Sequence, residues 1–225
     1  MLNASEVIFL LDVDDTLLDN DRFAADLTER LERSFGAAER ERYWAIFGRL
    51  REQLGLADYL GTLQAFRTGL EDHPELLAMS AFLLEYPFVD RLYPHALEAV
   101  GHLSRLGPTV ILSDGDIVFQ PRKIQRSGIS DAVDGRVMIY LHKERVLDHM
   151  VKRYPASHYV MVDDKANLLA AMKSTLGAKL TTVFVRQGHY AHAPGATSVK
   201  PAPDITIERI GDLITHPLSD FQEPP

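Results

Sequence analysis

The chain has 225 residues, of which 46% are hydrophobic, enough for one large or two small folded units with a substantial core. It contains no cysteine, which excludes disulfides and thiolate sites. Its net charge of −8 argues against non-specific nucleic-acid binding but not against an anionic small substrate. No apolar run reaches about 18 residues and no basic region precedes the first one, so we expect no membrane span, no signal peptide and a cytoplasmic location.

The first apolar run, residues 7–11, ends abruptly in the acidic sequence Asp12-Val13-Asp14-Asp15-Thr16. A run this short and this apolar predicts a strand buried on both faces of a parallel sheet. Side chains alternate along a strand, so Asp12 and Asp14 project to the same side. Two carboxylates this close repel each other, and they need a metal ion, a shared proton or solvent. Taken alone, a motif of this kind is more often a solvated acidic loop between a strand and a helix.

Residues 20–93 show no convincing strand pattern and predict helices instead. Apolar residues recur at every third or fourth position, and the first two helices stop at Gly36 and Gly55. Pro74 suits the first turn of the last helix, because its missing N–H has no partner there. We place these helices at 23–35, 43–54, 60–66 and 74–86. The segment therefore predicts a small helical unit inserted into another fold, with hinges at 19–20 and 93–94.

After residue 93, short apolar strands alternate with amphipathic helices. We place the helices at 97–106, 121–127, 144–154, 167–176 and 210–214, and the strands at 109–112, 136–141, 159–162, 181–185 and 205–207. Alternation of this kind implies right-handed crossovers and a parallel sheet between two helical layers. We read the Gly-, Pro- and Ala-rich segment 186–203 as a loop. The predicted fold class is α/β: a three-layer, Rossmann-like core of residues 1–19 and 94–225 with the α-helical insert 20–93.

Polar residues follow three further strands of this core. Ser113-Asp114-Gly115-Asp116 follows one strand, His142-Lys143 the next, and Asp163-Asp164-Lys165-Ala166-Asn167 the third. Because open α/β sheets bind ligands at the carboxyl ends of their strands, we expect these residues to converge beside Asp12 and Asp14. Each has an ordinary alternative, since the serine segment is also a good turn and the aspartate pair could be a solvated strand end.

In this order, the four motifs resemble the haloacid dehalogenase-like (HAD) superfamily of phosphohydrolases, and the insert resembles its C1-type helical cap. The resemblance covers residues 6–19 and about 94–215. It implies that Asp12 is a nucleophile that forms an aspartyl-phosphate, and that Asp14 protonates the leaving group and then takes a proton from water. Ser113 and Lys143 complete the implied catalytic set, Lys143 as a compact positive charge. Ser113 is implied to hold phosphoryl oxygens together with the backbone N–H groups of Asp114 and Gly115. Thr16 is a further implied cofactor-binding residue.

The resemblance also implies a Mg²⁺ cofactor, because carboxylate and carbonyl oxygens are the ligands that this ion prefers. The implied ligands are the Asp12 carboxylate, the Asp14 carbonyl and the Asp163 carboxylate, with Asp164 or Asn167 acting through water. The chain departs from the family pattern at two of these motifs. Asp15 replaces a glycine, and the pair Asp163-Asp164 replaces Gly-Asp, which leaves open which aspartate binds the metal directly.

The sequence and the resemblance together predict an enzyme that hydrolyses a phosphomonoester with the help of Mg²⁺. We expect a small phosphorylated substrate, no nucleic-acid or membrane partner, and a monomer or homodimer. A phosphomutase or phosphotransferase of the same family is an alternative, differing in the acceptor, and a receiver-like phospho-aspartate module is another. A receiver would be about half this length and would lack the insert. Dehalogenation is disfavoured, because that chemistry needs neither the Asp14 acid nor the metal carboxylates. An inactive binding protein is disfavoured by the complete catalytic set.

Several basic residues have competing interpretations. Lys123, on the helix after Ser113, competes with Lys143 for the role of the site lysine, and we favour Lys143 because it follows a strand. His189 and His192 have the spacing of a metal pair, but we interpret their segment as loop. Three arginines of the insert could bind a substrate anion or lie on solvated helix faces: Arg49, Arg51 and Arg67.

Overall fold

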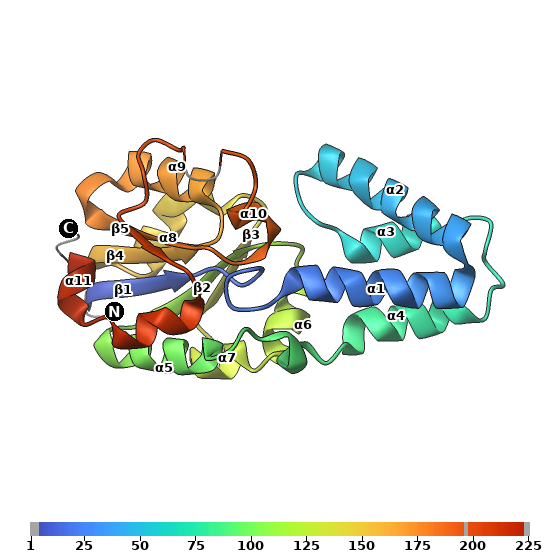
Figure 1. The fold of residues 1–225 in the computed structure, drawn as a ribbon, viewed down its shortest axis with the longest axis horizontal. Coiled ribbons are helices and arrows are strands. Elements are labelled where there is room, and N and C mark those ends of the chain that lie inside the picture. Colours follow the sequence, from blue (N-terminus) through green and yellow to red (C-terminus); the bar gives the residue numbers. More distant parts are fainter. Residues whose placement is uncertain (1–4, 196–197, 223–225) are drawn as a thin grey trace.

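The computed structural model describes residues 5–195 and 198–222 (Figure 1). Its centre is one six-stranded sheet in the order β3-β2-β1-β4-β5-β6, in which every neighbouring pair is parallel. The strands are β1 (Ser5–Leu11), β2 (Thr109–Asp114), β3 (Val137–Tyr140), β4 (Ala156–Asp163), β5 (Leu180–Val185) and β6 (Ile205–Ile207). The α/β fold class predicted from the alternation of strands and helices is therefore confirmed.

Alternate residues of each central strand pack on opposite faces of the sheet. In β1, Phe9 and Leu11 belong to one buried apolar cluster and Ile8 and Leu10 to the other. Helices α5 (Ala96–Leu106) and α7 (Ile129–Ala132) contribute to the first cluster, and α8 (Leu147–Arg153) and α9 (Ala166–Leu176) to the second. Figure 1 shows these two helical layers on either side of the sheet. Burial on both faces explains why the central strands are continuous apolar runs.

Four helices extend beyond one end of the sheet (Figure 1). They are α1 (Asn20–Phe35), α2 (Ala37–Leu54), α3 (Tyr59–Phe66) and α4 (Glu75–Glu85), close to the positions that the periodicity predicts. The Asp19 carboxylate accepts a hydrogen bond from the Arg22 N–H at 2.8 Å and so caps the start of α1. No strand of the sheet falls within residues 20–93, all of which are described. None of the helices in the described ranges combines the length and apolar character that a bilayer crossing requires.

The two chain segments that join these helices to the sheet run side by side. Leu18 forms an isolated antiparallel bridge with Leu92, the Asp19 N–H donates to the Arg91 carbonyl at 2.7 Å, and the Tyr93 N–H donates to the Leu17 carbonyl at 3.0 Å. These contacts lie at the hinge positions expected from the sequence. The apolar core nevertheless continues across this junction, because the buried residues of α1–α4 belong to the same cluster as α5.

The structure differs from the sequence prediction at three segments. The expected helix 144–154 is a 3₁₀ turn (Lys143–Arg145) followed by α8, and the expected last helix is a 3₁₀ helix (Ile210–Thr215) followed by α11 (Leu218–Gln222). Ile210 and Leu213 are both buried, a spacing of three that matches the 3₁₀ repeat. The segment read as loop contains a helical turn, α10 (Gly188–Ala191). The remaining short helices are α6 (Phe119–Arg126), Phe88–Arg91 and Gly177–Lys179.

Candidate active site

The carboxyl ends of three adjacent strands bring the predicted polar residues together. β1 lies between β2 and β4 in the sheet, and Leu11 is in register with Ile111 on one side and with Val162 on the other. The next residues along these strands include Asp12 and Asp163, which are both buried. Because parallel strands end at the same edge, residues far apart in the chain form one cluster there.

Lys143 lies at the centre of this cluster. Its Nζ atom is 2.5 Å from Asp12 Oδ1 and 2.6 Å from Asp163 Oδ2, and it donates a hydrogen bond to the Leu112 carbonyl at 3.2 Å. The side chain is fully buried. Burial alone would lower the pKa of Lys143, but Asp12 and Asp163 raise it above its ordinary value, so the ammonium group stays charged. The preference for Lys143 as the lysine beside Asp12 thus agrees with the geometry.

Three carboxylates around this lysine form a group that fits a cation. Ligand oxygens of Asp12, Asp163 and Asp164 lie within 4.8 Å of one another, and all three residues are buried. Among the described residues, Asp12 Oδ2, Asp163 Oδ2 and both carboxylate oxygens of Asp164 have no hydrogen-bond partner, although Asp163 Oδ2 forms an ion pair with Lys143. Burial and the neighbouring Asp163 raise the pKa of Asp164 to about 9. Buried oxygens left without partners are costly, and a hard divalent cation such as Mg²⁺ would satisfy them.

The two adjacent aspartates differ in how their oxygens are used. Asp163 Oδ1 accepts a hydrogen bond from the Lys165 N–H at 2.8 Å, and its Oδ2 atom is paired with Lys143. The resemblance implied a direct metal bond from Asp163, with Asp164 acting through water. Asp164 has the less engaged carboxylate of the two, because neither of its oxygens has a hydrogen-bond or ion-pair partner among the described residues. The Asp164 backbone N–H donates to Thr16 Oγ1 at 3.1 Å, so Thr16 orients the aspartate loop.

Asp14 is held by two residues of α6. Lys123 Nζ lies 2.7 Å from Asp14 Oδ1, and Gln120 Nε2 donates to Asp14 Oδ2 at 3.1 Å. Gln120 also donates to Ser113 Oγ at 3.0 Å. The sequence pattern indicated Lys123 only as an alternative to Lys143 for the site lysine, and it did not indicate Gln120. Their spacing of three places both on one side of a helix that follows the Ser113 strand, and this was the available signal.

One of the two backbone N–H groups predicted to hold phosphoryl oxygens is engaged in another contact. The Gly115 N–H donates to the Tyr140 carbonyl at 2.9 Å, so it is not free to bind a phosphoryl oxygen, and that prediction is corrected. A Cβ atom on Gly115 would lie 2.7 Å from Gln120 Cβ, which explains the glycine. The Asp114 carboxylate accepts a hydrogen bond from the Lys143 N–H at 2.7 Å, and burial raises its pKa to about 6.

Asp15, which replaces the family glycine, has a left-handed backbone with φ of 58°. Aspartate tolerates this region better than most residues, and glycine tolerates it best, which accounts for the substitution. Asp15 Oδ1 accepts hydrogen bonds from the N–H groups of Asn20 and Asp21 at 3.0 and 3.3 Å. Burial, Asp21 and Asp14 together raise the pKa of Asp15 to about 7. His189 Nδ1 contacts Asp21 Oδ1 at 2.5 Å, whereas His192 does not join this group.

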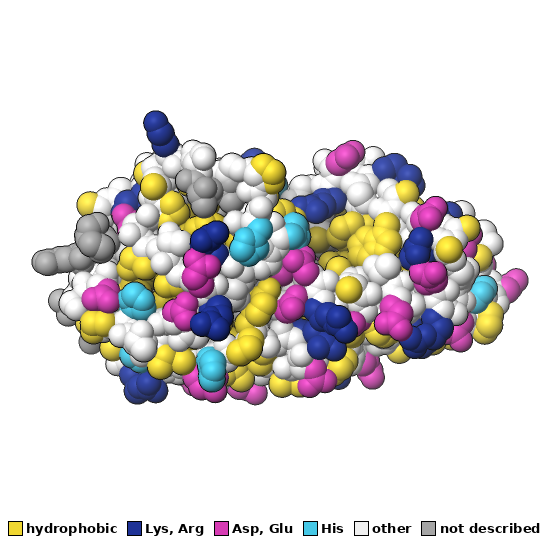
Figure 2. Space-filling model, viewed as in Figure 1, with side chains coloured by type: hydrophobic (Ala, Val, Ile, Leu, Met, Phe, Trp, Pro, Cys, Tyr) yellow, Lys and Arg dark blue, Asp and Glu magenta, His cyan; other side chains and the backbone are white. Residues whose placement is uncertain are grey.

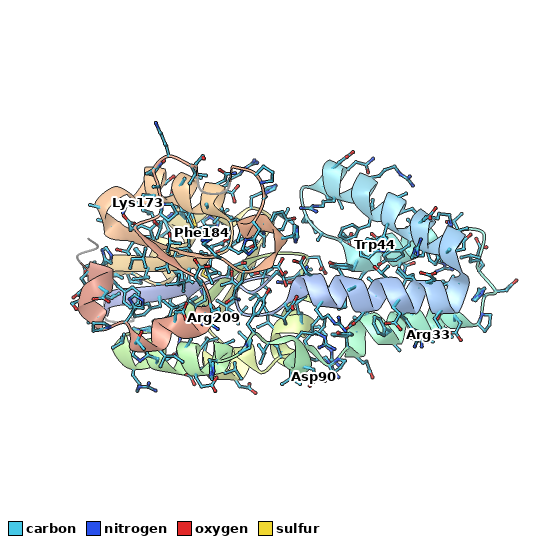
Figure 3. The ribbon with its side chains drawn as sticks, viewed as in Figure 1. Arg33, Trp44, Asp90, Lys173, Phe184 and Arg209 are labelled. Atoms are coloured by element: carbon cyan, nitrogen blue, oxygen red, sulfur yellow. The ribbon has the colours of Figure 1, made fainter. Side chains whose placement is uncertain are left out.

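A cavity of about 280 Å³ lies between the helical insert and the carboxyl edge of the sheet. Aromatic residues from both parts line it: Trp44, Phe47, Tyr59, Phe119 and Tyr190. Figure 2 shows hydrophobic side chains gathered in the hollow beside α2, and Figure 3 places Trp44 among the helices of the insert.

Of the three arginines considered above, Arg51 lines this cavity. Its guanidinium group donates to the Tyr190 hydroxyl and lies 5.6 Å from the centre of that ring. Arg49 and Arg67 line separate surface hollows within the insert.

The family model described as haloacid dehalogenase-like hydrolase matches residues 7–174. A solved haloacid dehalogenase-like hydrolase from Burkholderia xenovorans shares 58% identity, with a TM-score of 0.88 over 95% of this chain and 99% of that chain. A search of curated proteins found no match.

Two solved structures of low identity share the fold. L-2-haloacid dehalogenase from Xanthobacter autotrophicus, with chloropropionic acid covalently bound, has 18% identity and a TM-score of 0.56 over 92% of this chain and 96% of that chain. A HAD-hydrolase from Bacillus subtilis bound to magnesium has 14% identity and a TM-score of 0.59 over 95% of this chain and 100% of that chain.

Proposed function

The chain belongs to the haloacid dehalogenase-like hydrolases, and within this family we propose that it is a Mg²⁺-dependent phosphomonoesterase acting on a small phosphorylated metabolite. The observation that carries the proposal is the combination of a buried carboxylate cluster with free oxygens and a second carboxylate, Asp14, that lines the adjoining cavity. Dehalogenation uses neither the cluster nor the Asp14 acid. A chain that keeps both is better suited to phosphoryl transfer.

The proposed reaction has two steps. In the first, an Asp12 carboxylate oxygen bonds to phosphorus while the bond to the leaving oxygen breaks, and Asp14 gives its proton to that oxygen. In the second, Asp14 takes a proton from water, the water oxygen bonds to phosphorus, and the Asp12–phosphorus bond breaks to release phosphate. Because phosphoryl transfer leaves little covalent chemistry to the protein, most of its contribution is positioning and charge.

Individual residues support these steps by charge and orientation. Lys143 holds Asp12 Oδ1 at 2.5 Å, which fixes the nucleophile and offsets the charge of the phosphoryl group. Ser113 is buried beside Gln120 and offers its hydroxyl at the same edge. Asp12 and Asp164, with the Asp14 carbonyl, would hold the ion. When bound, Mg²⁺ would neutralise phosphoryl oxygens and reduce the repulsion between the carboxylates.

The cavity limits the size of the substrate. About 280 Å³ is near the lower end of the range for small-molecule sites, about 300–1,000 Å³, so the substrate is a small phosphomonoester rather than a polymer. The apolar and aromatic lining favours a carbon skeleton next to the phosphate.

A panel of small phosphomonoesters, assayed with Mg²⁺ and with chelator, tests the proposal. We expect phosphate release that the chelator abolishes and Mg²⁺ restores, and none from Asp12→Asn. A parallel assay measures halide release from 2-chloropropionate, for which we expect no activity. Full phosphatase activity in chelator would contradict the metal assignment. Halide release without phosphatase activity would make the protein a dehalogenase, and phosphate transfer to a second sugar rather than to water would make it a mutase.

A further inference from the structure

The second lysine of the site, Lys123, has surroundings unlike those of Lys143. Its side chain is 2% exposed, and Nζ is bound to Asp14 Oδ1 at 2.7 Å and to Asn20 Oδ1 at 3.0 Å. Three aromatic rings surround the ammonium group, with the centres of Phe23, Phe88 and Phe119 at 5.8, 5.8 and 5.3 Å. Burying an ammonium group is costly unless it is paired and hydrogen-bonded, and Asp14 is the carboxylate that pairs with it.

This contact fixes the orientation of the Asp14 carboxylate. Oδ1 accepts from a charged ammonium group at 2.7 Å, whereas Oδ2 accepts from a neutral amide at 3.1 Å, and charge-assisted hydrogen bonds are the stronger kind. Oδ1 is therefore the oxygen held firmly, and Oδ2 is the one better placed to exchange a proton with a leaving group. That oxygen lies 3.1 Å from Gln120 Nε2, and the same amide is 3.0 Å from Ser113 Oγ, so Oδ2 is the oxygen on the Ser113 side.

We propose that Lys123 is a positioning residue, which holds the general acid Asp14 through Oδ1 so that Oδ2 faces the leaving group. Asn20 is the first residue of α1, so the same ammonium group also ties Asp14 to the start of the helical insert. The two lysines then have separate tasks. Lys143 serves the nucleophile Asp12, and Lys123 serves the acid. This inference rests on the proposed phosphatase function.

The dependence of rate on the leaving group tests the role directly. The probes are p-nitrophenyl, phenyl and benzyl phosphate, which are similar in size but have increasingly basic leaving oxygens. The measured quantity is kcat/KM, because it reports the steps up to loss of the leaving group and excludes the hydrolysis of aspartyl-phosphate that all substrates share. A lysine that only stabilised the fold would lower all three values equally.

We expect Lys123→Met to lower kcat/KM for benzyl phosphate at least ~10-fold more than for p-nitrophenyl phosphate, because nitrophenolate leaves without a proton and acid catalysis is worth ~10²–10⁴-fold. The plot of log kcat/KM against leaving-group pKa should become steeper. Lys152→Met, which changes an exposed lysine of α8, is the matched control and should leave the slope unchanged. A Mg²⁺-induced rise in melting temperature in Lys123→Met shows that the folded site is intact.

Asn20→Ala keeps the lysine but removes one of its two acceptors, so it serves if Lys123→Met fails to fold. We expect a smaller steepening of the same plot. An unchanged slope in the folded variants, or an equal loss on all three probes, would overturn the positioning role while leaving the phosphatase proposal intact. Absence of Mg²⁺-dependent hydrolysis in the unmodified protein would instead refute the phosphatase function itself.

Discussion

Thermal stability distinguishes the two adjacent aspartates without any substrate. Both oxygens of Asp164 are buried without hydrogen-bond or ion-pair partners among the described residues, whereas Asp163 Oδ2 forms an ion pair with Lys143 and Oδ1 accepts from the Lys165 N–H. We therefore expect Mg²⁺ to stabilise the protein through Asp164. At a concentration 100 times Kd, a ligand that binds only the folded state stabilises it by ~2.7 kcal/mol. For a chain of this size that corresponds to a rise in melting temperature of about 5–10 °C.

The variants Asp164→Asn and Asp163→Asn should respond oppositely. The pKa of Asp164 is about 9, so without the ion its carboxyl group is neutral at pH 7, and the amide should cost little stability. That variant should lose the Mg²⁺ response. Burial raises the pKa of Asp163 as well, but its carboxylate is paired with the buried Lys143, so Asp163→Asn should cost more stability than Asp164→Asn without the ion.

The assay is thermal unfolding followed by circular dichroism, with a Mg²⁺ titration and a chelated reference for each variant. Asp163→Asn should melt at a lower temperature than the unmodified protein but still respond to Mg²⁺. A full Mg²⁺ response in Asp164→Asn together with its loss in Asp163→Asn would show that the assignment is reversed. No response in the unmodified protein would remove the metal site altogether.

Three further outcomes follow from the same structure. With p-nitrophenyl phosphate, Asp14→Asn should release a burst of about one nitrophenolate per site and then stall as aspartyl-phosphate, because no base activates water. Asp12→Asn should give no burst, and the opposite pattern would reverse the roles of the two aspartates. Arg51→Gln should change the ranking of substrates by kcat/KM more than it changes kcat. Arg49→Gln, on the same helix but away from the cavity, should leave that ranking unchanged. An equal effect of both substitutions would exclude a specific role for Arg51. The Asp204 carboxylate binds the side chains of Lys173 and Thr182 at 2.8 Å each, and its pKa lies below the ordinary 3.8 despite partial burial. Asp204→Asn should therefore lower the free energy of unfolding by about 1.5–3 kcal/mol at pH 7, and this difference should shrink as the pH falls below 3.8. A loss of stability that did not vary with pH would refute the charge contribution.

The local pattern of the sequence was sufficient for the strands, the helices of the insert and the residues at the strand ends. Short continuous apolar runs mark strands buried on both faces, a period of about four residues marks the buried face of a helix, and glycines such as Gly36 and Gly55 mark helix ends. These features are therefore readable without contacts between distant segments. The convergence of Asp12, Ser113 and Asp163 also followed from the sequence, because parallel strands place their carboxyl ends along one edge of the sheet.

The tertiary structure alone decided which side chains meet within that edge. The occupation of Asp163 by Lys143, the free oxygens of Asp164 and the engagement of the Gly115 N–H by Tyr140 depend on strand register and on how a loop crosses the sheet. Lys123 reaches Asp14 because α6 packs against aromatic rings of the insert, a contact between segments about 100 residues apart. Such pairings depend on the relative placement of whole elements, which the periodicity of a single segment does not encode.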